Sequence, residues 1–261
     1  MNSNRTPLAI LMLCLCGHIA AETFVLRPAQ AQYSVSLSGV PTGMDARIDL
    51  KEPSPSRFHI VFSVDHPLIK HQEESIFQWQ PSCHARPFGY SFNSKGFGIK
   101  RGGNVDFDWQ ALQASGSDSE YAITDEMVDA LGLAMVARCD LSAGNETLAY
   151  AVAEPDGVTD FNYKIVKREL LKTPAGTFNT IKLERIYPER GRRTFLWAAE
   201  ELDYFMVRMD HIENPLVRGK MELRSFEWAT PPGESLDASP HIKEDDNSRD
   251  AASSHNTSAV R

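Results

Sequence analysis

The sequence predicts a mainly β fold, an antiparallel meander curled into a barrel or half-barrel with one packed α-helix. Apolar and polar residues alternate with a period of two along many short segments, as in strands with one wet face. Buried parallel strands would instead read as continuous apolar runs. Turn residues separate the segments, and a single segment has helical periodicity. Because roughly a dozen antiparallel strands must protect their edges, we expect the sheet to curl or close.

Residues 1–31 have the pattern of a signal peptide. Arg5 precedes an apolar run at residues 8–16, which is too short to span a bilayer. Small residues place the expected cleavage after Ala21 or after Ala31. We therefore expect an exported, periplasmic protein, and an uncleaved membrane anchor is the alternative.

Two cysteines, Cys83 and Cys139, remain once such a signal is removed. A pair of cysteines in an exported chain predicts one disulfide. It would close a loop of roughly 55 residues and stabilise the fold by about 4 kcal/mol. The alternative is two separate buried thiols.

Composition indicates an ordinary globular protein, with 42% hydrophobic and 24% charged residues. Its formal net charge of −8 gives it no electrostatic reason to bind nucleic acid or anionic lipid head groups. We expect one antiparallel β domain over residues 32–229. The polar composition of residues 230–261 predicts a disordered tail.

The first half of the domain begins with a predicted hairpin. Apolar residues alternate with polar ones at 33–37 and 44–50, and residues 39–43 carry two glycines that suit a turn. Further strands are expected at residues 58–64, 76–79, 88–92 and 104–109.

The segment from Thr124 to Arg138 predicts the helix. Thr124 suits the N-cap, and Arg138 suits the negative end of the helix dipole. Met127, Leu131 and Met135 recur every four residues and form one apolar face. We expect this face to cover the β core; the alternative is a mobile lid over a ligand cavity.

The second half of the domain reads as a meander. Strands are expected at residues 148–152, 161–165, 181–184, 194–197, 204–209 and 221–224. Between the second and third of these, Thr173-Pro174-Ala175-Gly176 has turn chemistry, because proline pre-sets φ and glycine tolerates positive φ.

Three stretches of this meander, "TPAGTFNTIKLER", "RRTFLWAAEELDYFMVRMDH" and "GKMELRSFEW", resemble the bacterial domain-of-unknown-function family numbered 3108. Its members have a Thr-Pro-x-Gly-Thr-Phe turn, a Thr-x-x-Trp strand, an aromatic-proline-valine-arginine strand and a final Glu-Leu strand. Met206 stands where that pattern has proline. The resemblance covers residues 33–228 and implies an exported envelope protein of β architecture. It implies no activity, because the family has no established catalytic residues.

Catalytic and metal-binding motifs are absent from the sequence. It contains no Cys-x-x-Cys, His-Glu-x-x-His, Gly-x-Ser-x-Gly or dinucleotide-binding pattern. His66, His71 and His84 do not have the spacing of a compact metal motif. We therefore expect no enzyme activity, no catalytic residue, no bound metal and no cofactor.

Aromatic residues on the predicted strand faces are the candidates for a binding site. If the curled sheet leaves its interior unfilled, they line a concave apolar pocket, as in lipocalin-like or lipoprotein-carrier-like half-barrels. The expected ligand-binding residues are Phe58, Phe62, Tyr90, Phe92, Trp109, Tyr163 and Trp197. The alternative is that these side chains fill the core.

The leading hypothesis is a non-enzymatic binding or carrier module for a lipid or another apolar or amphipathic molecule. The alternative is an interaction protein of envelope assembly, which binds a protein partner through a sheet edge or face. An apolar cavity above roughly 300 Å³ would favour the carrier, whereas a filled core with an uncovered edge strand would favour the interaction protein. Short basic clusters, such as Lys100-Arg101, either contact anionic lipid or glycan or keep hairpin tips soluble.

Overall fold

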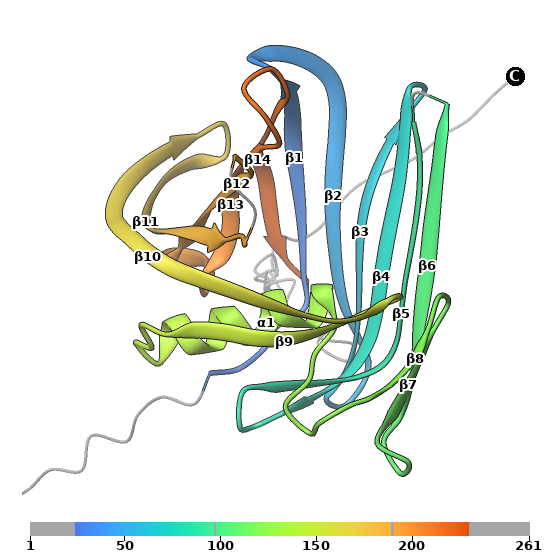
Figure 1. Cartoon of the computed structure of the whole chain (residues 1–261). Coiled ribbons are helices and arrows are strands. Elements are labelled where there is room, and N and C mark those ends of the chain that lie inside the picture. Colours follow the sequence, from blue (N-terminus) through green and yellow to red (C-terminus); the bar gives the residue numbers. More distant parts are fainter. Residues whose placement is uncertain (1–23, 97, 189–190, 230–261) are drawn as a thin grey trace, which may run out of the picture. The chain divides into compact units, whose positions relative to one another are not determined.

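The structure is a computed structural model that describes residues 24–96, 98–188 and 191–229. The described residues form a single antiparallel sheet of fourteen strands and one α-helix (Figure 1). The strands are β1 (Ala29–Leu37), β2 (Val40–Ser54), β3 (Arg57–His66), β4 (Ile69–Gln80), β5 (His84–Gly96), β6 (Ile99–Asp108), β7 (Gln113–Gly116), β8 (Glu120–Ala122), β9 (Leu148–Glu154), β10 (Gly157–Thr173), β11 (Gly176–Ile186), β12 (Arg193–Ala199), β13 (Phe205–Ile212) and β14 (Arg218–Trp228). The helices are α1 (Ala130–Ser142) and the 3-10 turn η1 (Glu200–Leu202). The expected polar tail and most of the expected signal peptide lie outside the described residues.

Strand order follows the chain except at one place. The order is β8-β7-β6-β5-β4-β3-β2-β1-β14-β13-β12-β11-β10-β9, so β1 lies between β2 and β14. The predicted alternation is confirmed on β2, where Met44, Ala46 and Leu50 are buried. The predicted turn after β10 is confirmed too, because Thr173 pairs with Gly176 across a two-residue loop.

The sheet is not closed into a barrel, so that alternative is wrong. Strands β8 and β9 are its edges, and no ladder joins them within the described residues. The two ends nevertheless touch, because Tyr121 Oη donates to the Glu154 carbonyl at 2.6 Å. Asp118 N also donates to the Pro155 carbonyl at 3.1 Å. The result is a curled, open sheet, and we call the side that faces α1 its concave face.

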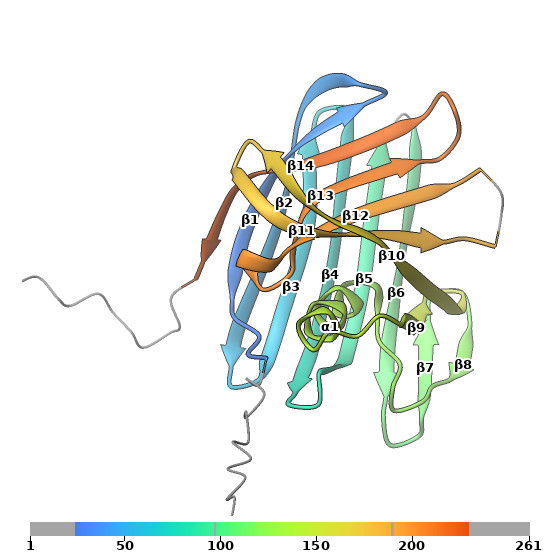
Figure 2. The ribbon, with the colours of Figure 1, turned by 90° about the vertical axis from the view of Figure 1, so that its left-hand side faces the viewer.

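Helix α1 lies on the concave face, against β4, β5 and β9 (Figure 2). The predicted bounds from Thr124 to Arg138 are wrong, since the helix begins after Asp129. That side chain caps the helix and accepts from Leu131 N at 3.0 Å and Gly132 N at 2.7 Å. The preceding Val128 is extended and pairs with Val152 of β9. Within the described residues, no helix combines the length and the apolarity that crossing a membrane requires.

A disulfide joins Cys83, in the turn between β4 and β5, to Cys139 of α1. Their Cα atoms are 5.7 Å apart, which is within the usual bridging distance. The predicted pairing is confirmed, and it fastens the second half of the helix to the sheet.

Candidate functional site

A small apolar cavity of about 130 Å³ lies between α1 and the concave face. Strands β2, β3, β11, β12 and β13 form its walls together with one side of the helix. The lining residues are Ile48, Ile60, Leu131, Ala134, Met135, Ala137, Arg138, Leu141, Leu183, Leu196, Trp197, Ala198, Tyr204, Phe205 and Met206. Since Ala134 is exposed, the cavity reaches solvent along the helix.

Arg138 is the charged residue of this lining, and its side chain is only 3% exposed. Its Nε donates to the Asp203 carbonyl at 2.9 Å, and its Nη1 lies 3.3 Å from Met135 Sδ. Among the described residues, its Nη2 has no hydrogen-bond partner. The guanidinium lies 4.9 Å from the ring centroid of Phe205. Burial lowers the pKa of Arg138 to about 10, so the group remains protonated at neutral pH.

This buried cation has no carboxylate partner within ion-pair distance in the described part of the chain. Asp203, whose carbonyl it contacts, holds its carboxylate 2.7 Å from Arg27 instead. A buried charge without a partner is costly. Because the guanidinium fork matches a carboxylate or phosphate, an anionic group in the cavity would complete its hydrogen bonding.

From the sequence, Arg138 is expected to favour the negative end of the helix dipole, and its place in the cavity wall is not predicted. The informative signal is its spacing, because Arg138 follows Leu131 by seven residues and Met135 by three. That spacing places Arg138 on the apolar face of the helix and not on its solvent-exposed face.

Six of the seven predicted aromatic residues do not line the cavity. Tyr90, Phe92 and Trp109 belong to a separate apolar cluster around β5 and β6. Their polar atoms are satisfied there, since Tyr90 Oη donates to Glu73 Oε1 and Trp109 Nε1 to the Pro87 carbonyl, each at 2.6 Å.

The other three aromatics of this group fill the core. Phe58 stacks on Phe77, with ring centroids 5.8 Å apart, beneath the helix. Tyr163 is half-buried against the same cluster, and Phe62 lies beside His71. These six side chains therefore pack against other parts of the protein and do not line the apolar cavity beside Arg138.

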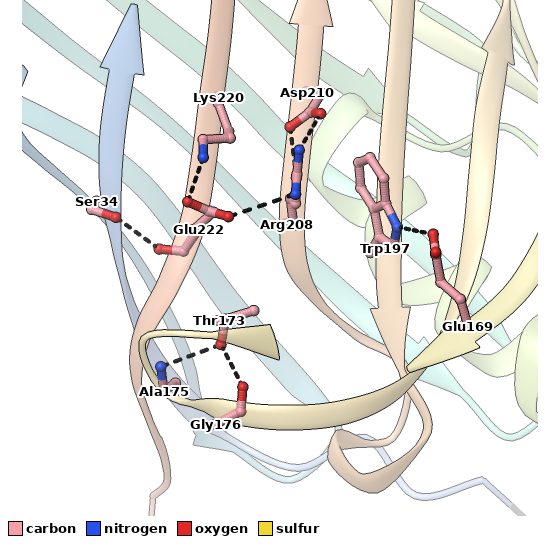
Figure 3. A network of polar contacts seen from close by, with 10 residues as sticks. All are labelled: Ser34, Glu169, Thr173, Ala175, Gly176, Trp197, Arg208, Asp210, Lys220 and Glu222. Carbon is pink, nitrogen blue, oxygen red and sulfur yellow. Dashed lines mark hydrogen bonds and ion pairs between the residues drawn. The ribbon is translucent and has the colours of Figure 1, made fainter. Parts of the chain in front are cut away.

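Trp197 borders the cavity, but its ring lies on the face of the sheet opposite to α1. Its strand neighbours Leu196 and Ala198 belong to the apolar cluster that contains Leu141 of α1. The Trp197 side chain lies between them in the strand and therefore points away from the helix. Trp197 Nε1 donates to Glu169 Oε1 at 2.8 Å, as Figure 3 shows. Lys182 lies over the ring at 4.6 Å and Arg208 at 4.7 Å.

Charges on this outer face are paired, in contrast to Arg138. Arg208 binds Asp210 at 2.6 Å, and Glu222 accepts from Lys220 at 2.7 Å (Figure 3). Arg208 also lies 3.7 Å from Glu222. These side chains satisfy one another, so their network is explained as structure without any ligand.

Metal binding has no comparable candidate. Within the described ranges, no three His, Cys, Asp or Glu side chains gather into a group that could hold a metal ion.

Comparison with known proteins places the chain in a family without an assigned function. The family model described as "Protein of unknown function (DUF3108)" matches residues 32–223. A search among curated proteins finds no match.

Two solved structures resemble the chain weakly. One is a "putative lipoprotein" from Parabacteroides distasonis ATCC 8503, with 11% identity, 77% of this chain and 96% of that chain covered, and a TM-score of 0.34. The other is a DUF1329 family protein from Desulfovibrio piger ATCC 29098, with 10% identity, 78% and 86% covered, and a TM-score of 0.28. Similarity at this level carries no argument about the site.

Proposed function

Because the chain belongs to the DUF3108 family, whose function is unknown, we propose a function from its own site. The protein is an exported, periplasmic, non-enzymatic binding module for an amphipathic molecule with an anionic head group. One observation carries this proposal: Arg138 is buried in the wall of an apolar cavity and has no counter-ion among the described residues.

The chemistry of the cavity supports this ligand class. The anionic head would bind Nη2 of Arg138, and the apolar walls would receive the chain next to it. The cavity volume of about 130 Å³ is below the usual range for a whole ligand, which begins near roughly 300 Å³. We therefore place only the head and the first part of the chain inside, with the remainder lying toward the exposed Ala134.

The lining also supports binding without catalysis. It supplies one guanidinium and one phenol, from Arg138 and Tyr204. The described lining contains no carboxylate, imidazole, hydroxymethyl or thiol group that could act as base or nucleophile. Export is supported by the disulfide, because such bonds persist in oxidising compartments.

The alternative function, partner binding through a sheet edge, is less well supported. Edge strand β8 is three residues long, and short edges resist pairing. The free side of β9 is partly occupied, because Val128 exchanges hydrogen bonds with Ala151 and Ala153 of that strand.

The proposal is tested by ligand binding to the protein purified without a tag from periplasm. Native mass spectrometry should show an added mass that organic extraction removes. The extracted protein should then bind 11-(dansylamino)undecanoic acid more tightly than its methyl ester, because only the acid can pair with Arg138.

Three variants sharpen this test. Arg138→Met should weaken binding of the acid about 10- to 100-fold and leave binding of the ester unchanged. Ala134→Trp should block both probes by filling the cavity mouth, while Ala143→Trp, at an exposed position beyond the lining, should bind as the wild type does. Equal binding of acid and ester by the wild type would overturn the proposal.

A further inference from the structure

Four hairpin turns lie at the end of the sheet that is farther from α1. They join β1 to β2, β3 to β4, β5 to β6 and β13 to β14, and both Figure 1 and Figure 2 show them together at the top. We call these turns and their described flanking residues, at 38–41, 66–70, 95–96, 98–101 and 214–218, the rim.

Each turn of the rim exposes an aliphatic side chain. Val40 is 65% exposed, Leu68 60%, Ile99 57% and Leu216 84%. Single exposed apolar residues are ordinary on a protein surface. Here the four lie on four neighbouring turns at one end, so they form a set of apolar tips around one side of the molecule.

Cations stand directly beside these tips. Lys70, Lys95 and Lys100 are cross-strand partners on β4, β5 and β6, in one row. Like charges placed directly opposite one another repel. Asp65 pairs with Lys70 at 3.1 Å, and no ion pair to Lys95 or Lys100 occurs within the described residues. Within the described residues, Lys95 and Lys100 therefore lack an anion that would neutralise them, whereas Lys70 has Asp65.

We propose that the rim docks on an anionic membrane surface. Aliphatic tips flanked by lysines suit the boundary between acyl chains and head groups, where the tips enter the apolar layer and the lysines meet phosphates. A protein partner would fit less well, because the cores of protein interfaces are depleted of charged residues. The chain as a whole carries −8 and is repelled by a negative surface, so the attraction is limited to this cationic end, which orients the protein as it approaches.

The test is flotation with vesicles, using protein purified from periplasm at low ionic strength. Wild type should float with vesicles of equal parts phosphatidylglycerol and phosphatidylcholine, and not with phosphatidylcholine alone. Lys95→Gln/Lys100→Gln should weaken partitioning about 30-fold, since each lysine near the surface contributes about 1 kcal/mol. Leu68→Ser/Ile99→Ser should also weaken it, because the tips can no longer enter the apolar layer.

A control variant makes the same change of charge elsewhere. Lys51→Gln/Lys172→Gln removes two exposed lysines near the β2–β3 and β10–β11 turns, outside the rim, and should float as the wild type does. Equal loss in this variant, equal flotation with both vesicle types or no flotation would overturn the proposal. So would a dimer that Leu68→Ser/Ile99→Ser dissociates, because the rim would then bind a second copy. The rim variants should still bind the dansyl acid. A failure of membrane docking can then be distinguished from a failure of the proposed ligand-binding function.

Discussion

The Ser75 hydroxyl on β4 donates a hydrogen bond of 2.5 Å to the carboxylate of Asp129, the residue that caps α1. Both side chains are fully buried. The contact joins the start of the helix to the concave face, and the disulfide of Cys139 joins its second half. The position of α1, and with it the cavity beside Arg138, is therefore fixed at two points.

The first prediction concerns pH. Burial raises the pKa of Asp129 to about 6, although the helix amides and Ser75 act in the opposite direction. Since the folded protein holds this proton more tightly, the contribution is favourable below pH 3.8 and is lost as the pH rises through about 6. Across that window, wild type should lose about 3 kcal/mol of unfolding free energy relative to Asp129→Asn.

Urea denaturation at several pH values measures this difference. Asp129→Asn keeps a cap acceptor and removes the charge, so it isolates the titration. Parallel stability profiles for the two proteins between pH 4 and 7 would contradict the prediction.

The second prediction concerns the disulfide. Cys83→Ala/Cys139→Ala should lower the unfolding free energy by about 4 kcal/mol, because the bond restricts a loop of 56 residues in the unfolded chain. Chemical denaturation with and without a thiol reductant checks this. Reductant should destabilise wild type and leave the double variant unchanged; an equal effect on both would show that the stabilisation has another source.

The third prediction concerns the contact between the two ends of the sheet. A Cβ at Gly116 would meet the Pro155 carbonyl group, which is backbone and cannot move aside easily. Gly116→Ala should therefore cost about 1–3 kcal/mol and speed hydrogen exchange in β9. Gly219→Ala is the matched control, because nothing lies within 4 Å of the added atom. Equal thermal melting of the two variants would argue against a close contact at Gly116.

The fourth prediction concerns signal cleavage, for which the sequence offers Ala21 and Ala31. Ala29 and Ala31 are fully buried in β1, where both pair with β2 and β14. Cleavage after Ala31 would remove these pairs, so we expect the mature chain to begin at Glu22. Intact mass of the periplasmic protein checks this, and a chain beginning at Gln32 would contradict it.

Alternation and turn chemistry were sufficient to predict most strands, because those signals are local. The start of the helix was not predictable in that way, since Thr124 and Asp129 are both good caps. Long-range contacts decide that Asp129 and not Thr124 is the N-cap. Val128 pairs with β9, and Ser75 hydrogen-bonds to Asp129 from 54 residues away in the sequence. Local signals also could not predict which face of the sheet holds the Trp197 ring. The ring is buried on the outer face by contacts with Leu171 and Phe178 of the β10–β11 hairpin.

Strand β1 has a consequence for the order of assembly. Its first neighbour, β2, follows it directly in the chain, but its second neighbour is the last strand, and Ala29 pairs with Trp228. All other ladders form between consecutive strands. When the chain is synthesised or exported with its N-terminus first, one edge of β1 must therefore remain unpaired until β14 is available. The slow step in folding is expected to be this single distant pairing, which joins two halves that are each able to form early.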